Sequence, residues 1–180
     1  MEAKECIRTR RSVRKYTDQP VSAETIGTII ETARFAPSWK NTQTARYIAV
    51  LDAELKARIA SEGTAGYDWN TKIISGAPAL IVITTEHGRS GYEKDGTFTT
   101  SKGTHWEAFD AGIAAEAFCL AAHAEGLATV IMGIYSEDAV REILQLPEEL
   151  GVSALIALGY PAEEGKNNRR KEVSELLTVR

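Results

Sequence analysis

The sequence predicts a single α+β domain over residues 1–180, with a mostly antiparallel sheet flanked by helices. Two observations lead to this fold class. Helical and strand patterns follow one another without the strict alternation that a doubly wound parallel sheet requires. No internal repeat and no linker rich in proline, glycine or serine divides the 180 residues, and 43% of them are hydrophobic, which is enough for one core.

The first clear helix begins at Ser22, a residue type that favours the N-cap position. Val21 stands where it can pack against the helix as a hydrophobic staple, and Pro37 is expected to end the helix. The apolar residues of this stretch recur at helical spacing: Ile26, Ile29, Ile30 and Ala33.

The next stretch predicts two strands around a second helix. Residues 46–51 (RYIAVL) and 79–85 (ALIVITT) have the β-branched and apolar composition of strands. Residues 53–62 form a helical pattern that Gly63 stops. Residues 86–104 contain four glycines and little apolar material, so we expect a long loop that is mobile when the site beside it is empty.

The second half of the chain predicts one long helix followed by shorter elements. Residues 105–125 contain eight alanines and precede Gly126, which suits a C-terminal cap. Because apolar residues cover much of its circumference, this helix is either central to the fold or buried against a partner subunit. The elements expected after it are a strand at 128–134, a helix at 136–145, a strand at 152–159 and a polar tail at 160–180.

Composition excludes several classes of protein. No apolar run approaches the roughly 20 residues that cross a bilayer, and the N-terminus lacks the apolar stretch of a secretory signal, so we expect a cytoplasmic protein without membrane association. Cys6 and Cys119 form no CxxC pair, which argues against a disulfide framework or a zinc knuckle. His87, His105 and His123 lack the short-range companions of metal ligands, so we expect packing or surface roles for them and no metal.

Two short basic segments interrupt a chain whose net charge is −4. Residues 8–15 contain five basic side chains and residues 166–171 contain four, and neither segment contains an acid. The remainder has twelve basic residues against twenty-five acidic ones. A nucleic-acid module usually has a basic face across the whole domain, so one small anion bound by both chain ends fits better. Two solvated basic runs without a ligand are the alternative.

Two further patterns suit a phosphate and a flat ring. Residues 10–14 (RRSVR) offer guanidinium groups, a hydroxyl and backbone N–H groups, which together can surround a phosphate. Residues 36–43 (APSWKNTQ) form a proline-broken turn that displays an aromatic ring beside polar groups and can line a pocket for a flat heterocycle. An ordinary helix-to-strand connection is the alternative. No GxSxG, GxxxxGK[ST], HExxH or post-strand GxGxxG pattern occurs.

Four segments, in this order and at these separations, resemble the FMN-dependent nitroreductase family: RRSVRKY, APSWKNTQ, GLATVIMGIYSEDAVREILQLP and ALGYPAEEGKNNRRK. The resemblance covers nearly the whole chain. It implies an α+β sandwich that forms an intertwined homodimer, with two FMN molecules at the subunit interface and residues of both chains around each. It also implies NAD(P)H as the reducing co-substrate.

The resemblance implies roles for individual residues by position. The residues that match the FMN phosphate and ribityl site are Arg10, Arg11, Ser12 and Arg14, with Arg169 and Arg170 closing on the same phosphate. The turn that reaches the flavin of the neighbouring subunit matches Pro37, Ser38, Trp39 and Asn41. The segment whose backbone faces flavin N5 matches Met132, Gly133 and Ile134, and the lysine near flavin N1 and O2 matches Lys72. No catalytic side chain is implied, because the reaction takes place at N5, with the Gly133 N–H and the Lys72 charge tuning the ring.

The sequence departs from the common family pattern in three places. Many relatives read NxQPW where this chain has NTQTA at 41–45, and many have tryptophan and two glycines where this chain has VIMGI at 130–134. An asparagine sometimes found three residues before the flavin lysine is Trp69 here, and Asn70 follows it, so the resemblance leaves both open as flavin contacts. These differences bear on the choice of substrate.

The sequence therefore predicts an NAD(P)H-dependent FMN oxidoreductase with a ping-pong mechanism and with nitroaromatics or quinones as electron acceptors. One alternative is a flavoenzyme of the same fold with other chemistry, such as dehalogenation, reduction of an activated C=C bond or oxidative flavin breakdown. Another is a non-catalytic protein that stores or senses FMN, because no dedicated nicotinamide pocket is visible. A nucleic-acid module is the weakest alternative, because the arginines lack interleaved aromatic residues for stacking.

Overall fold

The computed structural model describes all 180 residues and confirms the α+β fold class. Its centre is one four-stranded sheet in the order β1-β2-β4-β3, in which every neighbouring pair is antiparallel. The strands are β1 (Ala45–Val50), β2 (Ala79–Glu86), β3 (Ala128–Met132) and β4 (Leu150–Gly159). The strand predicted at 128–134 is two residues shorter, because Met132 is the last residue paired with β4.

Strands β2 and β4 form the middle of the sheet, and β2 is buried at every residue except Glu86. Successive side chains of a strand point to opposite faces of its sheet. Leu80 and Val82 accordingly pack in one hydrophobic cluster, whereas Ile81 and Ile83 pack in another. Each face of the sheet therefore needs its own layer of helices.

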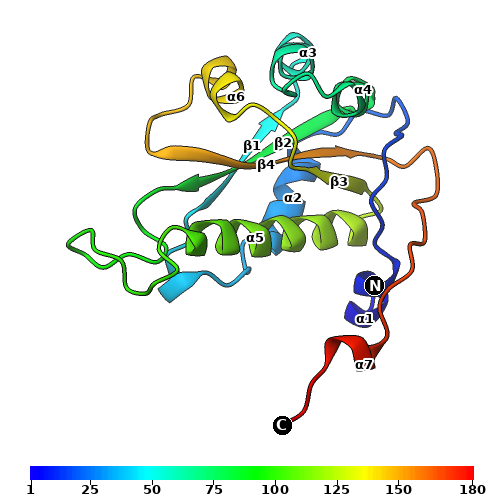
Figure 1. Cartoon of the computed structure of the whole chain (residues 1–180). Coiled ribbons are helices and arrows are strands. Elements are labelled where there is room, and N and C mark those ends of the chain that lie inside the picture. Colours follow the sequence, from blue (N-terminus) through cyan, green and yellow to red (C-terminus); the bar gives the residue numbers. More distant parts are fainter.

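Helices cover both faces of the sheet: α3, α4 and α6 lie on one side and α2 and α5 on the other (Figure 1). The helices are α1 (Ala3–Thr9), α2 (Ala23–Ala33), α3 (Ala53–Glu62), α4 (Asp68–Gly76), α5 (His105–Ala124), α6 (Glu137–Leu144) and α7 (Val173–Leu176), with a short 3-10 helix, η1 (Trp39–Asn41). The sequence pattern predicted α2, α3, α5 and α6, but not α1, α4, α7 or η1.

Local signals set the beginning of α2 but not its end. The Ser22 hydroxyl oxygen accepts the backbone N–H of Thr25 at 3.0 Å, as expected for an N-cap. The prediction that Pro37 ends this helix is wrong. The helix ends at Ala33, because the chain already turns at residues 34–35, before the proline is reached.

Helix α5 is the longest helix and is central to the fold, which was one of its two predicted settings. Phe118, Cys119 and Ala122 are almost fully buried against α2 and the sheet. Cys119 is thus a core residue. Gly126 follows the helix with φ of +80°, a left-handed conformation that favours glycine. Neither α5 nor any other helix has the length and apolar character that a membrane span needs.

The two ends of the chain run side by side along one edge of the molecule (Figure 1). The Thr17 N–H donates to the Tyr160 carbonyl at 2.9 Å, and the Ala162 N–H donates to the Lys15 carbonyl at 3.0 Å. These bonds bring the beginning of the C-terminal run onto the N-terminal segment. Both basic segments of the sequence therefore lie in one region.

Beyond this pairing, the C-terminal tail with α7 projects away from the sheet (Figure 1). Its apolar side chains are all more than half exposed: Val173, Leu176, Leu177 and Val179. A cluster of exposed apolar side chains on an extended tail is typical of a segment that packs against another chain.

Candidate functional site

A cavity of about 900 Å³ lies between the N-terminal segment, α4 and the C-terminal run. Its lining includes three of the residues predicted to bind a cofactor: Ser12, Arg14 and Lys72. Other lining residues come from the same three segments and include Lys15, Trp69, Glu163, Lys166 and Asn168. This volume is near the upper end of the range of roughly 300–1,000 Å³ that is usual for ligand sites.

The cavity is strongly positive. Arg14, Lys15, Lys72 and Lys166 line it, against the single acid Glu163. The Lys15 ammonium lies 3.7 Å from a Glu163 carboxylate oxygen, and the other three cations form no ion pair. Three like charges that gather without an ion-pair partner favour a bound anion, because the anion removes their mutual repulsion.

The sheet holds the N-terminal wall of this cavity in place through β3. Ser12 forms a parallel bridge with Thr129, and the Val13 N–H donates to the Thr129 carbonyl at 3.1 Å. The Tyr16 hydroxyl donates to the Val13 carbonyl at 2.7 Å. Burial raises the pKa of Tyr16 well above its usual value, so this hydroxyl keeps its proton and its hydrogen bond. Ser12 and Arg14 therefore lie on a well-supported backbone.

Arg10 and Arg11 do not line the cavity. The Arg10 Nε atom lies 3.4 Å from a Glu116 carboxylate oxygen on α5. Arg11 donates from Nη2 to Asn167 Oδ1 at 2.8 Å and from Nη1 to the Arg8 carbonyl at 2.5 Å. In this chain Arg11 thus joins the two basic segments, and direct phosphate contacts by Arg10 and Arg11 stay predictions.

Arg169 and Arg170 are exposed and do not line the cavity either. Arg170 donates from Nη1 to the Asn168 carbonyl at 3.0 Å. Lys166 and Asn168 of the same run do line the cavity, as does Lys15 at the other chain end. None of these three residues was predicted to bind the cofactor, although both lysines lie within the two basic segments whose charge indicated an anion site.

Trp69 and Asn70, which the resemblance left open as flavin contacts, both lie on helix α4 but have different surroundings. Trp69 is 54% exposed and lines the cavity beside Lys72. Asn70 is buried, and its Nδ2 atom donates to the Ile134 carbonyl at 2.8 Å. Trp69 therefore faces the cavity, whereas Asn70 supports the connection between β3 and α6.

That connection leaves one backbone segment open beside α4. The Met132 side chain is buried in the hydrophobic core, whereas Gly133 and Ile134 are exposed. No atom lies within 4 Å of the position that a Cβ of Gly133 would take. Asn70 fixes the Ile134 carbonyl to α4, but Met132, Gly133 and Ile134 do not line the 900 Å³ cavity, so the contact of the Gly133 backbone with the flavin stays a prediction.

The turn of residues 37–41 lies at the other end of α5 from the N-terminal segment (Figure 1). The Trp39 N–H donates to the Asp110 carboxylate near the beginning of α5. Near the end of the same helix, the Thr9 hydroxyl lies 2.8 Å from His123 Nε2. The two positions on α5 are about 20 Å apart at 1.5 Å per residue. One chain therefore does not bring this turn to its own cavity.

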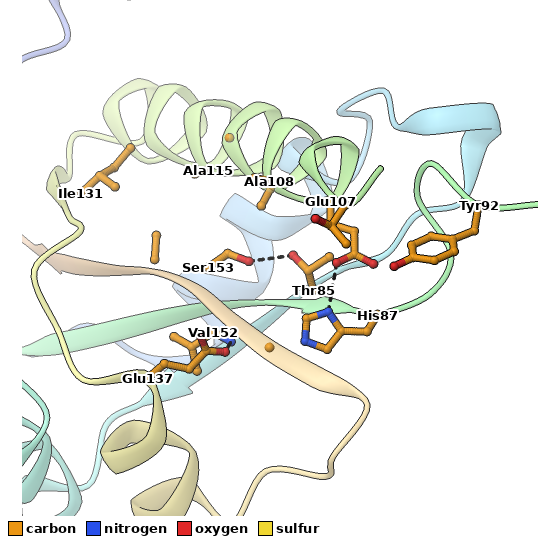
Figure 2. A pocket seen from close by; sticks show the side chains of 15 residues that line it. Thr85, His87, Tyr92, Glu107, Ala108, Ala115, Ile131, Glu137, Val152 and Ser153 are labelled. Atoms are coloured by element: carbon orange, nitrogen blue, oxygen red, sulfur yellow. Dashed lines mark hydrogen bonds and ion pairs between the residues drawn. The ribbon is translucent and has the colours of Figure 1, made fainter. Parts of the chain in front are cut away.

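A second cavity, of about 710 Å³, opens between α5, β2 and β4 (Figure 2). In it His87 Nδ1 lies 3.0 Å from a Glu107 oxygen, and the Thr85 and Ser153 hydroxyls lie 2.8 Å apart. Its wall on α5 consists of small residues: Ala108, Ala111, Gly112 and Ala115. No lysine or arginine lines it, so it lacks the guanidinium or ammonium groups that a phosphate needs.

Comparison with known proteins agrees with this geometry. The family model described as "Nitroreductase family" matches residues 7–160. The chain is 33% identical over 167 residues to an Archaeoglobus fulgidus protein named as an NADH dehydrogenase/NAD(P)H nitroreductase, over 89% of this chain and 87% of that protein. It is 32% identical over 169 residues to a Bacillus subtilis FMN reductase (NAD(P)H), over 89% of this chain and 66% of that protein.

A solved structure extends the comparison to the backbone. A Desulfovibrio desulfuricans protein described as a nitroreductase in complex with FMN superposes with a TM-score of 0.76 at 29% identity. The match covers 98% of this chain and 95% of that one.

Proposed function

Since the chain belongs to the nitroreductase family, we propose that it is an NAD(P)H-dependent oxidoreductase that holds FMN in the cavity lined by both chain ends. The observation that supports this most is the set of unpaired cations, Arg14, Lys72 and Lys166, around a space large enough for a flavin nucleotide. The similarity to a protein named FMN reductase and to an FMN complex gives independent support.

The N-terminal and C-terminal walls of the cavity fit the phosphate of FMN. Arg14 presents a guanidinium, which can form two parallel hydrogen bonds with a phosphate. Ser12 adds a hydroxyl donor from the same segment, and Lys166 adds an ammonium from the other chain end. In the proposed complex these groups bind the phosphate, which neutralises charges that have no partner within this chain.

Helix α4 and the segment after β3 fit the flavin ring. When bound, FMN takes electrons from the reduced nicotinamide at N5 and passes them to an acceptor. The Lys72 ammonium near the pyrimidine edge stabilises the negative charge of the reduced ring and so raises its reduction potential. The open Gly133 backbone can donate its N–H to ring N5. No acid–base side chain is needed for these roles.

The proposal includes a homodimer in which each site is completed by a second copy. The turn of residues 37–41 lies far from the cavity of its own chain, so its predicted contact with the flavin needs the neighbouring copy. The exposed apolar residues of the C-terminal tail, including Leu176 and Val179, favour the same arrangement because an intertwined dimer would bury them. Pro37, Ser38, Trp39 and Asn41 then border the partner's flavin.

The proposed reaction is ping-pong: the oxidised nicotinamide leaves before an electron-poor acceptor binds at the same face of the flavin. Nitroaromatics and quinones are the proposed acceptors. The ring centroids of Trp39 and Trp106 lie 4.5 Å apart, and Phe109 packs on Trp106 at 5.5 Å, so the turn offers an aromatic surface to a flat molecule.

An anaerobic absorbance spectrum tests the proposal. We expect the purified protein to bind one FMN per chain, to lose the flavin absorbance on addition of NADH or NADPH, and to regain it when a quinone or nitroaromatic is added. A protein that stays colourless after incubation with FMN would contradict the proposal. Bound FMN that neither nicotinamide reduces would indicate storage or sensing, and reoxidation only by halogenated or activated C=C compounds would indicate the other chemistry of this fold.

A further inference from the structure

Asp110 is a buried carboxylate that joins two segments distant in sequence. It lies in the first half of α5 and is 3% exposed. Its Oδ2 and Oδ1 atoms lie 2.9 and 3.1 Å from the Trp39 backbone nitrogen, which donates to them. Oδ2 also accepts the hydroxyl of the fully buried Ser90. No cation forms an ion pair with Asp110, so these N–H and O–H donors compensate for its burial.

On one side, Asp110 adds an external hydrogen bond to the turn that contains Trp39, whose own hydrogen bonds include the one from the Gln43 N–H to the Ser38 hydroxyl at 2.9 Å. Lys40 and Asn41 have φ of +43° and +56°. This left-handed conformation is unfavourable for residues other than glycine. Such residues keep it only where the surrounding structure holds them in it. The hydrogen bond at Trp39 fixes the residue just before these two, and with it the position of the Trp39 ring on the Trp106 ring.

On the other side, Asp110 fixes the beginning of the loop at residues 86–104. Ser90 donates to the carboxylate, and the next residue, Gly91, has φ of +87°. A Cβ at Gly91 would lie 2.9 Å from a ring carbon of Trp106, so the loop packs closely on that ring. The Trp106 Nε1–H donates to the Thr100 hydroxyl at 2.9 Å. The turn, the loop and Trp106 thus form one contact network around Asp110.

We propose that Asp110 is a positioning residue for the electron acceptor. By holding Trp39 and Ser90 together, it shapes an aromatic wall of Trp39, Trp106 and Phe109 that selects flat aromatic acceptors by stacking. The Phe109 ring is 59% exposed and extends the wall outward. This inference rests on the proposed function, because the wall meets an acceptor only if the Trp39 turn borders the flavin of the neighbouring copy.

Glu107 provides a matched control. It lies one helical turn before Asp110 on α5 and is also buried. Its carboxylate accepts the Gly88 N–H at 2.8 Å and lies 3.0 Å from His87 Nδ1, so it holds the same loop. It forms no hydrogen bond with the Trp39 turn. Glu107→Ala therefore removes a buried carboxylate and frees the beginning of the loop without freeing the turn.

Amide hydrogen exchange of the protein without added FMN tests the positioning directly. In Asp110→Ala we expect exchange in residues 38–43 to become about tenfold faster or more, because the lost hydrogen bonds held this turn. In Glu107→Ala we expect faster exchange only in residues 87–91. Asp110→Asn should restore most of the protection, because its amide oxygen accepts the Trp39 N–H and its NH2 group donates to Ser90.

If amide exchange in residues 38–43 became faster to the same extent in both alanine variants, the positioning role would be overturned. Unchanged exchange of these residues in Asp110→Ala would also overturn it.

Steady-state kinetics of the FMN-loaded enzyme tests the effect on the acceptor. For Asp110→Ala we expect the KM for a bicyclic quinone to rise roughly fivefold or more relative to that for a small monocyclic quinone, because the stacking surface is misplaced. The ratio of the two acceptor KM values is the readout, because the nicotinamide binds at the same face of the flavin and its reaction is also affected by the Trp39 turn. Glu107→Ala should leave the KM ratio unchanged.

An unchanged KM ratio in Asp110→Ala, in an enzyme whose flavin is still reduced, rejects the acceptor role and leaves the proposed function intact. A wild-type protein whose flavin no nicotinamide reduces rejects both.

Discussion

Arg11 donates a hydrogen bond to Asn167 across 156 residues of sequence, with 2.8 Å between Nη2 and Oδ1. This bond joins the two basic segments of the chain. Arg14 and Lys166, from the same two segments, line one cavity. The uneven charge of the sequence therefore corresponds to a single positive cavity in the fold.

Replacing Arg14 with alanine should weaken the binding of FMN but hardly change that of riboflavin, which lacks the phosphate. A hydrogen bond to a charged group contributes about 1.5–3 kcal/mol, so the Kd for FMN should rise roughly 10- to 150-fold. Quenching of flavin fluorescence during titration measures both affinities. Lys94→Ala removes an exposed cation from the 86–104 loop and serves as the control. An equal loss of affinity for both flavins would place Arg14 at the ring.

Replacing Lys72 with methionine should lower the reduction potential of the bound flavin, because the reduced ring loses a stabilising positive charge. The expected shift is roughly 30 mV, equivalent to about 1.4 kcal/mol for a two-electron couple. Photoreduction in the presence of a reference dye measures the potential. Lys72→Arg keeps the charge and should stay near wild type. A potential that is the same in the methionine variant and in wild type would remove Lys72 from the proposed ring contacts.

Replacing Gly165 with alanine should push the two chain ends apart. A Cβ at this position would overlap the Arg11 side chain. We expect a stability loss of about 1–3 kcal/mol from the overlap and a weaker affinity for FMN. Gly27→Ala in α2 is the control, because open space surrounds it and alanine favours a helix by roughly 0.5–1 kcal/mol. Wild-type stability and FMN affinity in Gly165→Ala would show that the close packing of the ends is unimportant.

Replacing Asn70 with alanine should destabilise the protein by about 1–3 kcal/mol, because the Ile134 carbonyl loses its buried donor. Thermal unfolding measures the loss. Trp69→Ala, one residue earlier, removes a half-exposed ring from the cavity wall. It should affect flavin binding more than stability. Weaker flavin binding in Asn70→Ala together with lower stability in Trp69→Ala would contradict these roles.

The stability of the protein should fall as the pH drops below about 6.5, the ordinary pKa of histidine, partly because of His123. Burial, and then the positive charges of Arg10 and Arg11, lower the pKa of His123 in the folded state. Below pH 6.5 the unfolded chain therefore binds this proton more readily than the folded one, and the stability is lost progressively until the lowered pKa is passed.

Urea unfolding at pH 7.5 and at pH 5.5 measures this difference for wild type and for His123→Gln. The variant should lose less stability on acidification. His105→Gln, at the exposed beginning of α5, is the control. The same loss in wild type and in His123→Gln would exclude His123 as a source of the pH dependence.

Helices with strong local signals were predictable, and α4 was not. Ser22, the N-cap predicted for α2, accepts the Thr25 N–H at 3.0 Å, an interaction that a short stretch of sequence reveals. Helix α4 begins after Tyr67, which provides no side-chain cap, and its buried apolar residues are the adjacent pair Ile73 and Ile74. Its formation depends on packing against α3 and the core, which no local pattern shows.

The charge pattern indicated the region in which the candidate cavity lies, but not which arginines line it. Arg10 and Arg14 belong to the same basic segment, yet Arg14 lines the cavity and Arg10 faces Glu116 on α5. The bridge between Ser12 and Thr129 fixes this backbone, and its partner strand lies more than a hundred residues away. Asp110 was equally invisible, because a carboxylate in a helix usually faces solvent.

The most direct test of the central claim is a crystal structure of the protein with FMN bound. The phosphate should lie within about 3 Å of the Arg14 guanidinium and the Ser12 hydroxyl, with a basic side chain of residues 166–171 beside it and the ring next to Lys72. A phosphate bound elsewhere, with Arg14 and the C-terminal basic segment left in solvent, would contradict the account.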